Sequence, residues 1–168
     1  MIELKSVRAI AADGPGFVVQ TKAVSKEGVE RWDGAGFFLR PEEAILELSS
    51  HCKKPANRDV LVAICDRIAS VKNNFKAVSF ESFQFESFRL RRADTTLFVV
   101  ERLGIAESGR EAGKETVKSL GWYNQVPVAL GRMFDMVLHS SQFTTLGELR
   151  NRINAFAASV EAAGSGER

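Results

Sequence analysis

The sequence is poor in the residue types that carry chemistry, with two histidines, His51 and His139, and two cysteines, Cys52 and Cys65. A closed structural zinc site needs four ligands at paired spacings, and these four residues do not provide them. Nucleophilic catalysis needs a serine or cysteine beside a histidine that an acid orients, and we identify no such constellation. We therefore expect a protein that is not an enzyme and that uses no metal or other cofactor.

The sequence also lacks long apolar runs and an excess of charge of one sign. No run approaches the roughly 20 residues that span a bilayer, and the first ten residues, MIELKSVRAI, lack the apolar core of a signal peptide. We expect a cytoplasmic protein with no membrane partner, whose cysteines pack as small apolar residues rather than forming a disulfide. Lysine and arginine exceed aspartate and glutamate by a formal charge of +2, so non-specific nucleic-acid binding gains little support.

A glycine-rich stretch at residues 109–116, GREAGKET, is not a P-loop. Three residues rather than four separate its glycines, and Glu115 stands where serine or threonine should follow the lysine. We interpret this stretch as a solvated hairpin tip.

What the sequence does contain is an internal repeat. Residues 6–23 (SVRAIAADGPGFVVQTKA) align with a second stretch that begins at Ser87, and the shared residues lie 81 positions apart. Further along, Gly36 and Leu61 align with Gly121 and Leu146, and the offset is 85. The change of offset falls in a turn, where residues 108–118 (SGREAGKETVK) replace a shorter stretch around Ser25, and insertions are tolerated in turns. We interpret the chain as a tandem duplication.

Apolar alternation and turn residues predict three strands followed by two helices in each copy. We expect an α+β protein of two tandem βββαα repeats, with antiparallel sheets, helices on one face and a pseudo-two-fold arrangement. The first repeat spans residues 1–75, the second 76–160, and residues 161–168 form a disordered tail. The alternation slips once at Lys5-Ser6 and at the corresponding place in the second copy, which predicts a β-bulge in each first strand.

Helical spacing and capping residues predict the helices. In the first copy a helix begins at Pro41, and Asp59 caps the next. In the second copy a helix runs from 126 to 138, and Thr144 or Thr145 caps the last, with Glu148 completing a capping box. The last helices should bury equivalent residues, which are Leu61 and Ile68 in the first copy and Leu146 and Ile153 in the second.

The second copy resembles short, uncharacterised proteins of phages and other mobile elements. The similarity covers residues 93–156, and more weakly 12–71. It rests on the aromatic pair in Gly121-Trp122-Tyr123, on Ala129-Leu130 and on a capped helix at residues 145–153, TLGELRNRI. The resemblance implies a phage or mobile-element origin, a bacterial host cell and a single-unit ancestor. It implies no activity.

Basic residues gather on the hairpin of the second copy, with Glu101, Glu107, Glu111 and Glu115 interleaved among them. A neutralised, solvated hairpin explains this pattern better than a phosphate-binding stripe does. Trp122 is either a core residue or, if exposed, an interface anchor. Our candidate partner-binding residues are Arg89, Arg91, Arg102, Arg110, Lys114 and Trp122.

The missing catalytic constellation and the duplicated scaffold lead to a functional hypothesis. We expect a non-enzymatic phage or mobile-element accessory protein that binds a host or phage protein complex. Inhibition of a host defence system, as an anti-CRISPR protein does, is one concrete form. The alternative is a nucleic-acid-binding module that uses arginine-bearing sheet faces. The sequence does not predict the oligomeric state.

Overall fold

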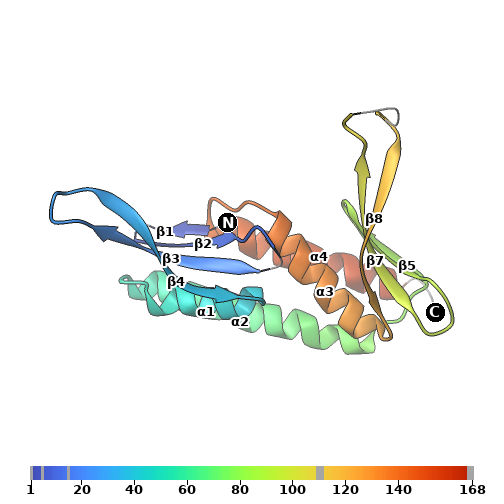
Figure 1. The fold of residues 1–168 in the computed structure, drawn as a ribbon. Coiled ribbons are helices and arrows are strands. Elements are labelled where there is room, and N and C mark those ends of the chain that lie inside the picture. The colour runs from blue at the N-terminus through green and yellow to red at the C-terminus, as the bar shows by residue number, and fades with distance from the viewer. Residues whose placement is uncertain (1, 5, 15, 109–111, 166–168) are drawn as a thin grey trace. The chain divides into compact units, whose positions relative to one another are not determined.

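The computed structural model describes residues 2–4, 6–14, 16–108 and 112–165. These ranges form two four-stranded antiparallel sheets and four α-helices, so the predicted α+β class is confirmed (Figure 1). The first half contains β1 (Ile2–Leu4), β2 (Val7–Ala11), β3 (Phe17–Val24), β4 (Glu30–Phe38), α1 (Pro41–Ser50) and α2 (Pro55–Asn74). The second contains a short 3-10 helix (Phe75–Ala77), β5 (Ser82–Phe85), β6 (Phe88–Arg92), β7 (Phe98–Ile105), β8 (Glu115–Tyr123), α3 (Val126–Ser140) and α4 (Leu146–Ser165).

Each sheet has four strands instead of the predicted three because the first predicted strand is a hairpin. The predicted β-bulge falls at Lys5-Ser6, of which Lys5 lies outside the described residues. The flanking strands β1 and β2 pair antiparallel, with Leu4 opposite Val7, instead of forming one bulged strand. In the second sheet β5 and β6 pair in the same way, with Phe85 opposite Phe88. Paired residues lie on the same face of a sheet, so a two-residue turn produces the same slip in apolar alternation as a bulge.

Bulges do occur, but in the long hairpins. Between β3 and β4, Val19 pairs with Gly36 and Gln20 with Gly34, which leaves Ala35 as an extra residue. Between β7 and β8, Val100 pairs with Gly121 and Glu101 with Ser119, which leaves Leu120 extra.

Gly36 and Gly121 each lie beneath an aromatic ring two residues further on. A Cβ atom added to Gly36 would lie 2.7 Å from the Phe38 ring, and one added to Gly121 would collide with the Tyr123 hydroxyl. Glycine therefore leaves the space that each ring fills.

The helices begin where proline and acidic residues favour a first turn. Pro41 begins α1 as predicted, with Glu42 and Glu43 in its first turn. The predicted cap of the second helix, Asp59, is wrong because α2 already begins at Pro55. The first turn of a helix leaves its backbone N–H groups unpaired, so proline, which has no N–H, is tolerated there. Pro55 therefore starts a helix here rather than breaking one.

The cap of α4 is made by the predicted residues, Thr144, Thr145 and Glu148. Glu148 donates its backbone N–H to the Thr145 hydroxyl at 3.1 Å. In return, its carboxylate accepts from the backbone N–H of Thr144 at 2.7 Å. The helix extends to Ser165, five residues into the predicted disordered tail, and residues 166–168 lie outside the described part of the chain.

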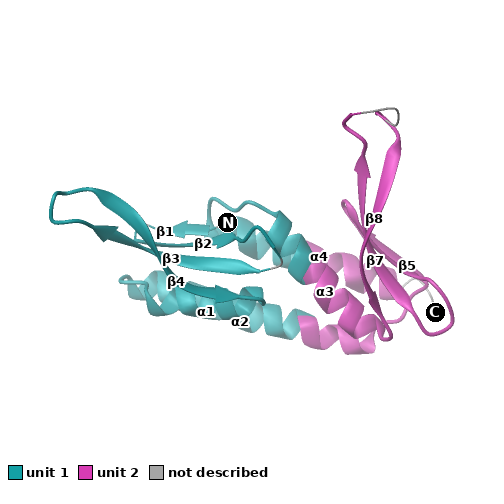
Figure 2. Ribbon diagram, in the orientation of Figure 1, with its two compact units in different colours: residues 1–71, 135–154 teal, residues 72–134, 155–168 magenta. Residues whose placement is uncertain are grey.

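The chain forms two compact units whose residues interleave along the sequence (Figure 2). The first comprises Met1–Val71 and Asp135–Asn154, and the second comprises Lys72–Phe134 and Ala155–Arg168. Helices α2, α3 and α4 therefore contribute residues to both units. The repeat boundaries at residues 1–75 and 76–160 concern the sequence and stay a prediction.

In the first unit α1 contacts β2, β3 and β4 and covers one face of their sheet. Leu61 and Ile68 are fully buried, as predicted. Ile153 is buried as well, but Leu146 is only half-buried, so its predicted burial is wrong. Leu149, one turn further along α4, is 2% exposed and takes the core position.

In the second unit the core is a cluster of phenylalanine rings. The ring of Phe156 lies 4.9 Å from that of Phe134 and 5.0 Å from that of Phe85, measured between centroids. Phe75 and Phe83 contact it edge-on at 6.0 and 5.7 Å. Such rings bury large areas and favour tilted or edge-on contacts.

Among the described helices, none combines the length and the apolar character needed to cross a bilayer.

Candidate functional site

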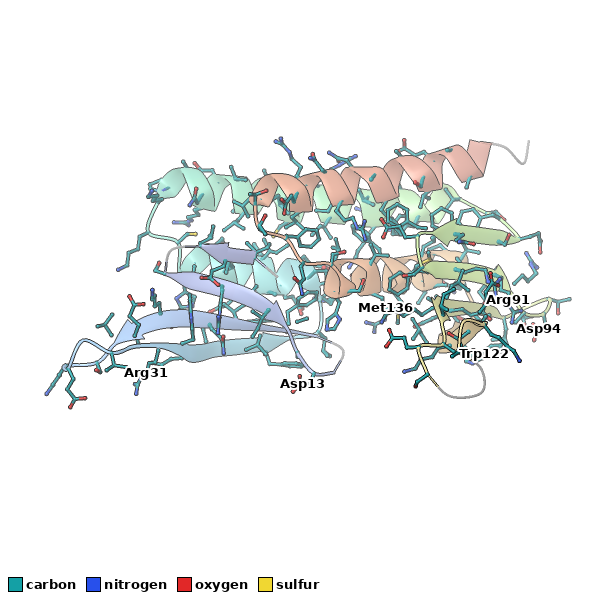
Figure 3. All side chains as sticks on the ribbon, turned by 90° about the horizontal axis from the view of Figure 1, so that it is seen from above. Asp13, Arg31, Arg91, Asp94, Trp122 and Met136 are labelled. Carbon is teal, nitrogen blue, oxygen red and sulfur yellow. The ribbon has the colours of Figure 1, made fainter. Side chains whose placement is uncertain are left out.

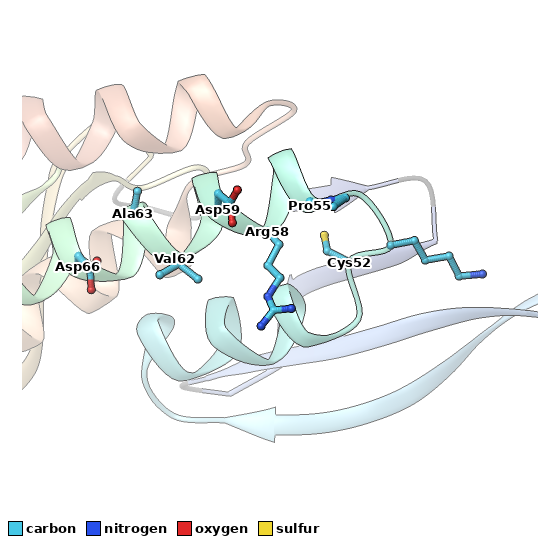
Figure 4. Close-up of a pocket in the computed structure, with 8 residues that line it drawn as sticks. Cys52, Pro55, Arg58, Asp59, Val62, Ala63 and Asp66 are labelled. Carbon is cyan, nitrogen blue, oxygen red and sulfur yellow. The ribbon is translucent and has the colours of Figure 1, made fainter.

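A hollow of the first unit lies along α2 and the loop before it, and it is open to solvent (Figure 4). It is lined by Cys52, Lys53, Pro55, Arg58, Asp59, Val62, Ala63 and Asp66. Burial raises the pKa of the Cys52 thiol above its ordinary value, and no histidine lines the hollow. Burial, with Asp66 and Glu42 nearby, raises the pKa of the Cys65 thiol to about 12. Both thiols are free and protonated near neutral pH, so the hollow has no activated nucleophile.

The second sheet carries a more distinctive arrangement on the face opposite the phenylalanine cluster. Phe88 and Leu90 of β6 are buried on the cluster side, so Arg89 and Arg91 lie on the other side by strand alternation. Cross-strand pairing forms two rows there: Arg89 with Glu101 and Ser119, and Arg91 with Val99 and Trp122. We call this the arginine face, defined by Arg89, Arg91, Val99, Glu101 and Trp122.

Glu101 is the centre of the arginine face and is bound by both arginines. Arg89 donates from Nε to Oε2 at 2.8 Å, and its Nη2 lies 2.7 Å from the same oxygen. Arg91 donates from Nε to Oε1 at 3.0 Å, with its Nη2 at 2.9 Å. Glu101 is 2% exposed, so this is a buried acid held by one charge-assisted hydrogen bond from each arginine.

The electrostatics of Glu101 favour its ionised form. Burial by itself raises the pKa of this carboxyl, but the hydrogen bonds and charges of Arg91 and Arg89 outweigh it. The pKa of Glu101 therefore lies below its ordinary value, and the group is an anion at neutral pH. Two cations and one anion leave the cluster with an excess of positive charge.

We expect Glu101→Ala to lower the free energy of unfolding by about 1–3 kcal/mol at pH 7, because it removes the acceptor of both arginines. The loss should lie near the lower end of that range, since the Arg89 and Arg91 side chains are 33% and 42% exposed and can be hydrated. Urea denaturation measures it, with Glu101→Gln as the control that keeps one acceptor.

This stabilisation should also depend on pH. The pKa of Glu101 is lower in the folded state, so its contribution is present above the unfolded pKa, about 4.3. It is lost as the pH falls through the lower folded value. The difference between wild type and Glu101→Gln should therefore shrink below about pH 4. A difference that stays constant from pH 7 to pH 3 would contradict the ion-pair assignment.

Trp122 gives the arginine face an exposed aromatic ring. It pairs with Val99, which is fully buried and in turn pairs with Arg91. Trp122 itself is 58% exposed, and it lies on the second sheet with Arg91 (Figure 3). A buried valine thus separates a cation and an exposed indole within one row.

The structure does not bring all the candidate residues together. Arg102 pairs with Phe88 and lies on the opposite face of the sheet, with its guanidinium carbon 5.9 Å from the Phe88 ring. Lys114 precedes β8 in the long turn after Ile105, beyond the part of the sheet that β6 pairs with. Arg110 lies outside the described residues. The partner-binding roles of these three residues stay a prediction.

The first sheet has an arginine at the position equivalent to Arg89, but different side chains surround it. Arg8 donates from Nε to the side-chain oxygen of Gln20 at 2.8 Å, as Arg89 does to Glu101. Its guanidinium lies 4.3 Å from the centre of the Trp32 ring and 3.9 Å from Glu3, and the side chain is 24% exposed. The guanidinium of Arg8 is therefore engaged by side chains of its own sheet.

Glu101 is the functional candidate that the sequence reasoning missed, because we treated it as one of several interleaved surface acids. A signal was available in the repeat: Glu101 stands 81 positions after Gln20, just as Arg89 stands 81 positions after Arg8. Conserved spacing of a donor and an acceptor on neighbouring strands indicates a cross-strand pair.

The described residues hold no group of three or more histidine, cysteine, aspartate or glutamate side chains arranged as a metal site. Comparisons with protein-family models, with curated proteins and with solved structures find no match to this chain.

Proposed function

We propose that this chain is a non-enzymatic binding protein, an accessory factor of a phage or mobile element that docks on a host protein complex through the arginine face. The observation that carries the proposal is Trp122, a large aromatic residue 58% exposed beside an organised arginine pair. Tryptophan and arginine are the residue types that contribute most often to interface hot spots.

The buried acid supports this proposal over an accidental surface. A glutamate buried between two arginines is expensive to desolvate and contributes little net stability compared with apolar residues of similar size. It does fix both guanidinium groups in position, so that their conformational entropy is already lost before a partner binds. An organised pair of this kind suits recognition better than it suits stability.

Capture from a lysate of the host bacterium tests the proposal, with two matched variants. Trp122→Ala should reduce the recovery of the specific partner complex at least tenfold, as loss of a hot spot does. Phe37→Ala is the control, because Phe37 occupies the corresponding place in the first sheet and is 57% exposed. Equal recovery with wild type and Trp122→Ala would refute the proposal for this face.

Inhibition of a host defence complex, as an anti-CRISPR protein performs it, is the concrete form that we propose. Cells that express the protein should then lose interference against a matching phage, and the Trp122→Ala variant should restore it. Intact interference in cells that express wild-type protein would contradict this form and leave other host complexes as targets.

We also propose that the chain arose by tandem duplication of one unit. The two sheets support this with equal strand orders, β1-β2-β3-β4 and β5-β6-β7-β8. Their bulges provide further support, since each falls directly after the aligned valines Val19 and Val100. The pseudo-two-fold arrangement of the copies stays a prediction. A crystal structure in which residues 2–71 superpose on 83–156 by a rotation far from 180° would contradict it.

Nucleic-acid binding is the second candidate, and the exposure of Arg89 and Arg91 favours it. Glu101 weakens it, because the acid neutralises one of the two charges. Affinity for a duplex should fall steeply with salt if several phosphates are contacted. A shallow dependence would leave protein binding as the better proposal.

A further inference from the structure

We infer that the arginine face recognises a carboxylate on an acidic, extended segment of a protein partner, an inference that rests on the proposed protein-binding function. Arg89 and Arg91 would bind the carboxylate, and Trp122 would pack against an apolar side chain near it in the same segment. The inference follows from the donors that Glu101 leaves unused, from the contrast with the first sheet and from the position of Trp122.

The first step concerns the donors. A guanidinium group has five N–H donors. Glu101 accepts a hydrogen bond from the Nε of each arginine, and one Nη of each lies within ion-pair distance of the same oxygen. More than half of the donors of each group thus remain, and the described residues provide no further acceptor for them. The side chains are 33% and 42% exposed, so a ligand from solvent can reach them.

The second step is the contrast between the two sheets. Arg8 of the first sheet is covered by Trp32 and accompanied by Gln20 and Glu3. In the second sheet the residue aligned with Trp32 is Val117, which is 54% exposed and has no aromatic ring to stack on a guanidinium. The residue aligned with Ile10 is Arg91, a second cation. In the first sheet the arginine is thus engaged by side chains of its own sheet. In the second sheet the two arginines keep unused donors and an excess of positive charge.

The third step selects a carboxylate on a protein. The planar fork of arginine matches a carboxylate in two hydrogen bonds, and both arginines of this face already bind one carboxylate, that of Glu101. A phosphodiester strand would need a run of cations, but the arginine face is defined by two, Arg89 and Arg91, and Glu101 neutralises part of their charge. The excess charge suits one anionic group rather than a polyanion.

The last step is the apolar neighbour. Trp122 and Arg91 stand in one cross-strand row with Val99 between them. Across such a row, positions two strands apart lie about 10 Å from each other. Side chains on one face of an extended segment repeat every 6–7 Å or so, so an acid and an apolar side chain of one segment can reach both positions.

Two synthetic peptides and one oligonucleotide test this inference by fluorescence anisotropy at about 150 mM salt. In the first decapeptide, each side of the extended chain carries both glutamate and leucine. The second decapeptide has glutamine in place of every glutamate. The oligonucleotide is single-stranded DNA of ten nucleotides. We expect saturable binding of the glutamate peptide and at least tenfold weaker binding of the other two. Equal binding of the glutamine peptide, or tighter binding of the DNA, would overturn the inference.

The matched variant is the double substitution Arg91→Ile with Glu101→Gln, which gives the second sheet the residues of the first, Ile10 and Gln20. The first sheet folds with that pair, so the variant should fold, and circular dichroism checks it. We expect at least a tenfold loss of affinity for the glutamate peptide. Unchanged affinity in the folded variant would exclude the arginine pair as the binding site.

The same variant separates this inference from the proposed function. If Trp122→Ala abolishes capture of the host complex and the double variant does not, the face binds protein but does not recognise a carboxylate. If neither variant affects capture, the proposed function fails together with the inference. If both abolish capture and the peptide discrimination holds, both stand.

Discussion

Replacing Phe156 by alanine should lower the free energy of unfolding by about 3–5 kcal/mol, the range for truncating a fully buried phenylalanine. Phe156 is 0% exposed, and its ring contacts those of Phe75, Phe83, Phe85 and Phe134. Those four rings come from three elements, the 3-10 helix, β5 and α3, so neighbouring groups cannot close the cavity without moving several of them. The loss should therefore fall in the upper part of that range.

Urea denaturation followed by circular dichroism measures this effect, and Phe37→Ala is the matched control. Phe37 is 57% exposed, so the same chemical change should cost about 1 kcal/mol or less. Similar losses in both variants would show that the cluster around Phe156 does not form the core of the second unit.

The second large effect should come from Leu149→Ala, at about 2–5 kcal/mol. Leu149 is 2% exposed and lines a small apolar cavity of about 30 Å³ with Ile45, Leu138 and Phe143. Truncation would enlarge a void that already exists, and destabilisation rises with the volume of the residual cavity.

Leu146→Ala is the internal control for this prediction because Leu146 lies one turn away on the same helix and is only half-buried. The same truncation there should cost less than half as much. If Leu146→Ala proved the more damaging change, the assignment of Leu149 as the core residue of α4 would be wrong.

These two helix positions show what the sequence could and could not predict. Apolar residues at helical spacing identified the buried side of the last helix, including Ile153. The same stripe also included Leu146, because periodicity assigns residues to a side of a helix but does not say where its packing begins. The alignment with Leu61 pointed the same way, yet Leu61 is fully buried and Leu146 is not.

The first strand of each sheet was misassigned for a similar reason. A slip of one residue in apolar alternation fits both a bulge and a two-residue hairpin, because either one restores the apolar residues to the same face. In the second sheet Glu86 has a positive φ of 52°, which a tight turn of this kind requires. Glutamate gives no glycine-like or asparagine-like signal for such a backbone, so the hairpin could not be recognised there.

The candidate site was predicted in part. Its arginines and Trp122 were identified by composition, but the sequence order of charges does not say which side of a sheet each occupies. Arg102 seemed equivalent to Arg89 and Arg91 until pairing placed it opposite Phe88. The role of Glu101 depends on burial and on two neighbours from another strand, which no local pattern reports.

The extra residue in β8 decides where the indole is displayed. Ser119 lies on the arginine face, and an uninterrupted strand would direct position 121 to that face and position 122 to the phenylalanine cluster. Leu120 breaks the alternation, so Trp122 faces outward and Gly121 inward. Deletion of Leu120 would keep these faces, because Gly121 would then follow Ser119 directly and point inward, and Trp122 would still point outward. Loss of this one codon from the gene should thus leave recognition intact, whereas a change that pairs Leu120 with Val100 would turn the indole toward the phenylalanine cluster.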